Sequence, residues 1–130
     1  MKKESYYKKL FLIGAIWNFT AGLQFFFLHR QIFSILGIPP VQDALYIEFF
    51  AMSVLLFGLG YYWVSKDLTQ NHDIVKLGII GKILVFATTI FHYIFHDCTH
   101  IVLVLGGVGD LIFAVFFIKF LKDKNFQASA

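Results

Sequence analysis

The residues with the clearest capacity for chemistry are charged side chains inside apolar stretches. Lys82 lies in the middle of the apolar stretch 74–95, and Asp110 lies inside the next one, 99–121. A lysine at the centre of a membrane-spanning helix costs roughly 2.5–3.5 kcal/mol on the insertion scale, so we expect a counter-charge nearby. Counted from the turn between the stretches, Lys82 is about 15 residues back and Asp110 about 13 forward, which puts their depths within about 3–5 Å. We therefore predict a Lys82–Asp110 ion pair, which either serves function or only fixes the register of two helices.

A second set of polar residues falls in the outer third of the same stretches. Thr89, His92 and His96 recur at helical spacing after Lys82, so all four are expected on about one stripe of a helix. Glu48 lies about one turn inside its own stretch, where its carboxylate either reaches the headgroups or opens into a pocket. We predict an outward-facing pocket above the ion pair, lined by Glu48, Gln24, Asn18, Thr89, His92 and His96.

The histidines also bear on metal binding. The i, i+4 spacing of His92 and His96 can present two imidazoles to one metal. His100 is not expected to continue that face, because the helix must end between residues 96 and 99. We predict no cofactor and no metal; if a metal or a haem binds, His92 and His96 are the expected ligands. His92 is otherwise a candidate for a pH-sensitive pocket residue, and no catalytic residue is recognisable.

The elements that must position these residues are four apolar blocks. The chain is 58% hydrophobic and 15% charged, against about 45–50% and about 25% in soluble domains. Each block is about 19–23 residues long, close to the ~20 residues that cross a hydrocarbon core of ~30 Å. We predict an all-α, integral membrane four-helix bundle, one domain over residues 1–130, with spans at about 10–28, 44–65, 74–95 and 99–121.

The connections between the spans carry their own signals. Residues 29–42 include apolar side chains at helical spacing and then Gly37, which predicts a short interfacial helix. Asp43 is expected to cap the second span, and Asp97 or Thr99 the fourth. Because residues 96–99 leave room only for a tight turn, the third and fourth spans should form an antiparallel hairpin.

The distribution of basic residues predicts the topology. With both termini in the cytoplasm, nine lysines fall on the cytoplasmic side and only Arg30 lies on the other: Lys2, Lys3, Lys8, Lys9, Lys66, Lys76, Lys119, Lys122 and Lys124. This is the positive-inside pattern, so we predict an N-in, C-in protein of the bacterial cytoplasmic membrane. The lysines flank apolar blocks rather than forming one basic face, which argues against nucleic-acid binding. The single cysteine, Cys98, excludes an intrachain disulfide.

Three segments carry a family resemblance: Gly14–Asn18, the loop Leu36–Pro39 and Gly109–Ala114. Together they resemble the DoxX-like group of small bacterial membrane proteins. The resemblance implies a four-helix membrane protein and no particular reaction, since many members have no assigned function. The chain is also distantly similar to EXPERA-type four-helix bundles, which include sterol isomerases and binding proteins with acidic residues in a membrane cavity. That likeness concerns Glu48 and Asp110 in kind only and implies no catalytic role for either.

Three functional hypotheses follow from these residues. The first is a non-enzymatic membrane protein that binds a small or lipidic ligand in the outward-facing pocket. The second is a membrane enzyme or redox protein that uses Glu48 and the outer histidines for metal, haem or acid–base chemistry. The third is a structural or accessory subunit of a membrane complex. Four spans make a thin bundle, so a homodimer is a further expectation, with no interface assigned.

Overall fold

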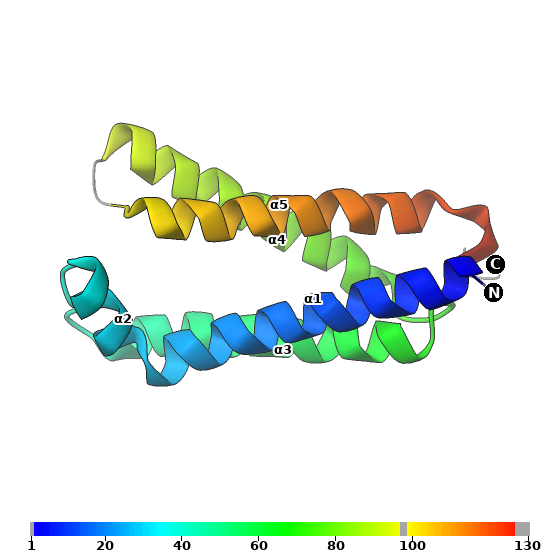
Figure 1. Ribbon diagram of the computed structural model, residues 1–130, viewed down its shortest axis with the longest axis horizontal. Helices are drawn as coiled ribbons and strands as arrows, with labels where there is room; N and C mark the ends of the chain where they lie inside the picture. The colour runs from blue at the N-terminus through cyan, green and yellow to red at the C-terminus, as the bar shows by residue number, and fades with distance from the viewer. Residues whose placement is uncertain (1, 97–98, 127–130) are drawn as a thin grey trace. The chain divides into compact units, whose positions relative to one another are not determined.

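The computed structural model describes residues 2–96 and 99–126, and these residues are helical apart from short connections (Figure 1). Within the described ranges there are five α-helices and no strand, which confirms the predicted all-α fold. Four helices are long and apolar enough to cross a membrane: α1 (Lys2–Phe27), α3 (Ala44–Lys66), α4 (His72–Phe95) and α5 (Ile101–Lys122). The fifth helix is the short α2 (His29–Leu36), and a single 3-10 turn, Lys124–Phe126, follows α5.

The chain divides into two compact units, Met1–Asp67 and Leu68–Ala130. In the first unit α1 packs along α3, and in the second unit α4 packs along α5, each pair running antiparallel (Figure 1). The hairpin predicted for the third and fourth spans is therefore present. The single-domain organisation stays a prediction.

We call the α1–α3 pair the first hairpin and the α4–α5 pair the second hairpin. In the first hairpin, α1 begins at Lys2, well before the predicted span start at residue 10. Its first turns are polar but helix-compatible, and Lys8 Nζ lies 2.8 Å from Glu4 Oε1 in an i, i+4 ion pair. Further along, α1 and α3 approach closely at Gly22 and Gly58. A Cβ on Gly22 would lie 2.6 Å from Leu55 Cγ, so only glycine fits there without a shift of Leu55.

The ends of α2 and α3 follow the expected capping chemistry. Gly37 ends α2 in the left-handed conformation, with φ 66° and ψ 24°, and the N–H of Ile38 donates to Phe33 O at 2.8 Å. Asp43 caps α3 because its Oδ1 accepts from the backbone N–H of Leu45 at 3.0 Å. Both predictions are confirmed, while the location of α2 in the membrane interface stays a prediction.

The start of α5 differs from the prediction. His100 is the N-cap, and its Nδ1 accepts from the backbone N–H of Val102 at 3.2 Å. The helix therefore begins at Ile101, and Thr99 is not the cap. An imidazole nitrogen can satisfy an orphan N–H as a carboxylate or hydroxyl does, which is why the sequence signal was misassigned. Asp97, the other predicted cap, and Cys98 lie outside the described residues.

Candidate functional site

The polar centre of the second hairpin is the contact between Lys82 on α4 and Asp110 on α5. Lys82 Nζ donates to Asp110 Oδ1 at 2.5 Å. The two side chains are 5% and 19% exposed, so the pair is largely enclosed by the protein. Lys82 Nζ also lies 5.3 Å from the ring centroid of Phe113, a further stabilising contact for a cation. This enclosed, charge-assisted hydrogen bond joins α4 to α5 and favours one register between the two helices.

Thr89 lies two turns further along α4, at the contact with α5. Its hydroxyl is within hydrogen-bond reach of two carbonyl oxygens of its own helix, those of Val85 and Phe86. Opposite it is Gly107, where a Cβ would lie 2.8 Å from Thr89 Oγ1. The hydroxyl of Thr89 thus donates to its own helix backbone, and the side chain lies at a close approach of α5, so helix packing accounts for its position.

His92 and His96 lie together at the end of α4. Their ring centroids are 4.9 Å apart with planes inclined by 35°, and the ring of Phe91 lies 5.7 Å from that of His92 and 5.3 Å from that of His96. His92 is half-buried and His96 is exposed. The backbone N–H of His96 donates to His92 O at 3.1 Å, which closes the helix. Each imidazole ring carries two nitrogens that can take part in hydrogen bonds.

Among the described residues, His92 and His96 are not part of a larger cluster of metal-binding side chains. Nowhere in residues 2–96 and 99–126 do three or more His, Cys, Asp or Glu side chains gather closely enough to hold a metal ion. A metal at His92 and His96 would therefore have two protein ligands from this part of the chain.

The remaining predicted residues belong to the first hairpin. Asn18 is 6% exposed and its Nδ2 donates to the backbone oxygen of Val54 at 3.2 Å, so its amide links α1 to α3. Gln24 is exposed on α1, and Glu48 is half-buried near the start of α3. The prediction placed all three in one pocket with the α4 residues. Asn18, Gln24 and Glu48 belong to the first compact unit, whereas the α4 residues belong to the second. That they line one pocket together stays a prediction.

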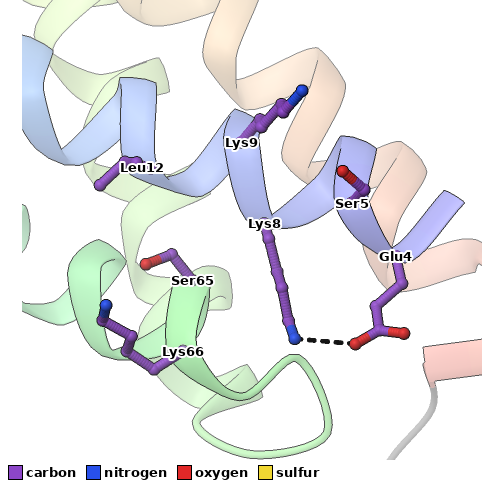
Figure 2. Close-up of a pocket in the computed structure, with 7 residues that line it drawn as sticks. All are labelled: Glu4, Ser5, Lys8, Lys9, Leu12, Ser65 and Lys66. Atoms are coloured by element: carbon purple, nitrogen blue, oxygen red, sulfur yellow. Dashed lines mark ion pairs between the residues drawn. The ribbon is translucent and has the colours of Figure 1, made fainter. Parts of the chain in front are cut away.

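The sequence reasoning missed a pocket in the first hairpin. It has a volume of about 440 Å³ and lies between the beginning of α1 and the end of α3 (Figure 2). Its lining contains three lysines, two serines, one glutamate and one leucine: Glu4, Ser5, Lys8, Lys9, Leu12, Ser65 and Lys66. A signal was present in the chain, because Ser5, Lys8, Lys9 and Leu12 follow the i, i+3, i+4, i+7 pattern of one helix face.

The chain was also compared with known proteins. No family model, no curated protein and no solved structure matches it. The resemblance to DoxX-like proteins therefore stays a prediction, and function has to be argued from the residues of the two hairpins.

Proposed function

We propose that the protein is a multi-pass protein of the bacterial cytoplasmic membrane that binds a small or lipidic ligand without catalysing a reaction. The four apolar helices account for the membrane part of this proposal. The polar stripe of α4 accounts for the ligand part: it runs from the ion pair at Lys82 outward past Thr89 to His92 and His96.

The observation that carries the proposal is the enclosed Lys82–Asp110 pair. Charged side chains inside membrane-spanning helices are rare and commonly mark a ligand or ion path, because burying them is costly. Here Lys82 lies on about the same face of α4 as His92 and His96, which are nearer the end of that helix. Apolar side chains would pack α4 against α5 equally well, so helix packing alone does not require the buried ion pair.

The proposed ligand carries a polar head and an apolar body. A hydroxyl, carbonyl or carboxyl head matches the donor and acceptor capacity of His92 and His96. The aromatic ring of Phe91, in contact with both histidines, supplies apolar surface for the body. The positive-inside distribution of lysines supports a site that opens away from the cytoplasm.

Mass spectrometry of molecules that co-purify with the protein tests this proposal. We expect one defined compound, in near-stoichiometric amount, after purification in a mild detergent. His92→Phe should weaken the affinity for it about tenfold and so lower the amount retained, because a lost hydrogen bond of about 1.4 kcal/mol corresponds to that factor in Kd. Tyr93→Phe, one residue along on an exposed part of α4, is the matched control and should retain the compound. Only bulk lipid in the wild-type sample, unchanged in His92→Phe, would contradict the proposal.

A second candidate function rests on the contact between the rings of His92 and His96. Two adjacent imidazoles can ligate a metal or a haem, or transfer protons, as a membrane enzyme or redox protein requires. Glu48 would then be the predicted proton carrier. Elemental analysis and an absorption spectrum of the same purified sample separate a metal or haem protein from a ligand carrier. A role as an accessory subunit and a homodimer stay predictions.

A further inference from the structure

The pocket at the beginning of α1 is formed within one hairpin and has a consistent chemical character. Three of its seven lining side chains are lysines and one is a glutamate, so its net charge is positive. Leu12 adds an apolar contact, and Ser65 is nearly fully buried. A volume of about 440 Å³ lies within the range of small-molecule sites, about 300–1,000 Å³.

The two lysines that matter most come from different helices. Lys8 is on α1, and its Nζ lies 2.8 Å from Glu4 Oε1 at the rim of the pocket (Figure 2). Lys66 is the last residue of α3, and its Nζ lies 4.8 Å from the ring centroid of Tyr62. Lys9 leaves α1 on a different side from Lys8 in the same view. An anion between α1 and α3 would therefore meet Lys8 and Lys66 first.

The existing contacts of these lysines leave capacity for a ligand. An ammonium group has three donors, and the ion pair with Glu4 uses one of those of Lys8. Both side chains of that pair are about half exposed, at 43% and 48%, so the pair is weak enough for a phosphate anion to compete with it. Ser65 donates its proton to Tyr62 O at 2.6 Å, so its hydroxyl can only accept from a ligand hydroxyl or a water and does not donate to the anion.

We propose that this pocket binds a phosphate group, either the headgroup of an anionic phospholipid or a free phosphate compound. Lysines bind phosphate as point charges, and a basic pocket between helix ends matches the headgroup depth of a membrane. The pocket lies on the lysine-rich side, which the positive-inside pattern assigns to the cytoplasm. It belongs to a different hairpin from the polar stripe of α4, so this inference is independent of the proposed function.

The test uses the whole protein in two arms. In the lipid arm, nanodiscs contain phosphatidylcholine with a minor fraction of phosphatidylglycerol, and native mass spectrometry measures which lipid the protein retains. In the free-phosphate arm, inorganic phosphate is titrated onto the protein in a neutral detergent. Selective retention of phosphatidylglycerol supports a lipid headgroup. Saturable binding of inorganic phosphate without lipid selectivity supports a free phosphate compound.

Variants connect either signal to the pocket. Lys8→Gln and Lys66→Gln should each weaken binding about fivefold, the factor expected for one basic residue near an anionic surface. Glu4→Gln should strengthen it, because Lys8 loses its competing carboxylate. Lys122→Gln, at the end of α5, removes the same charge outside the pocket and should leave binding unchanged. The inference is overturned if neither arm shows binding, or if Lys122→Gln reduces binding as much as Lys8→Gln and Lys66→Gln do.

Discussion

Replacing Lys82 by methionine is expected to destabilise the protein by about 3–5 kcal/mol, the cost of leaving one partner of an enclosed ion pair without the other. The substitution keeps an unbranched side chain, one atom shorter, but leaves the carboxylate of Asp110, which is 19% exposed, without its counter-charge. Asp110→Asn should cost a similar amount, because it leaves the ammonium group of Lys82 instead. The free energy of unfolding in bicelles, measured by steric trapping, checks both values.

The double variant Lys82→Met/Asp110→Asn separates a coupled pair from two independent residues. Because no unpaired charge remains, its cost should fall well below the sum of the two single variants. Lys122→Met is the matched control: it removes a lysine at the end of α5 and should change stability by no more than about 0.5 kcal/mol. Additive costs in the double variant would show that the contact contributes no coupling energy between α4 and α5.

Replacing Gly107 by leucine is expected to disrupt the second hairpin by at least about 1–3 kcal/mol, the usual cost of overpacking. Even the first added carbon would lie 2.8 Å from Thr89 Oγ1 and 3.4 Å from Phe86 Cα. Gly106→Leu is the matched control, since a Cβ there meets no heavy atom within 4 Å. It should be neutral or mildly stabilising, as glycine is the less favourable helix residue.

A rescue experiment identifies the atom responsible. Gly107→Ala should destabilise the wild-type protein but have little effect in a Thr89→Ala background, because the hydroxyl that it meets is then absent. Thermal unfolding in a mild detergent is sufficient for this comparison. Equal destabilisation by Gly107→Ala in both backgrounds would show that the close approach does not involve Thr89.

The helices could be predicted because a membrane leaves an apolar stretch few backbone conformations. A block of about 20 apolar residues has few alternatives to a spanning helix, since its backbone must satisfy its own hydrogen bonds in lipid. The relation between Lys82 and Asp110 also followed from counting, because a tight turn converts positions in two helices into comparable depths. Gly37 and Asp43 acted as local caps whose effect does not depend on distant residues.

The assignments that depended on rotation about a helix axis were harder to make. Depth along α1 suggested Asn18 as a pocket residue, yet its amide donates to Val54 O on α3. Thr89 shares a stripe with His92, but its hydroxyl is within reach of backbone oxygens of α4. Residue types predict burial, whereas the partner of a polar group depends on which helix packs alongside it. The basic pocket was missed because its lysines were interpreted only as topology signals.

Labelling of single cysteines tests the central claim, that the polar stripe of α4 forms a site open to the outside. In a Cys98→Ser background, His92→Cys and Tyr93→Cys have the same depth but lie on different faces of α4. The account predicts that a membrane-impermeant maleimide labels His92→Cys in intact cells and labels Tyr93→Cys far more slowly, because a thiol in lipid does not ionise. Lys66→Cys, on the predicted cytoplasmic side, should react only after permeabilisation. Equal labelling at residues 92 and 93, or labelling of His92→Cys only after permeabilisation, would contradict the account.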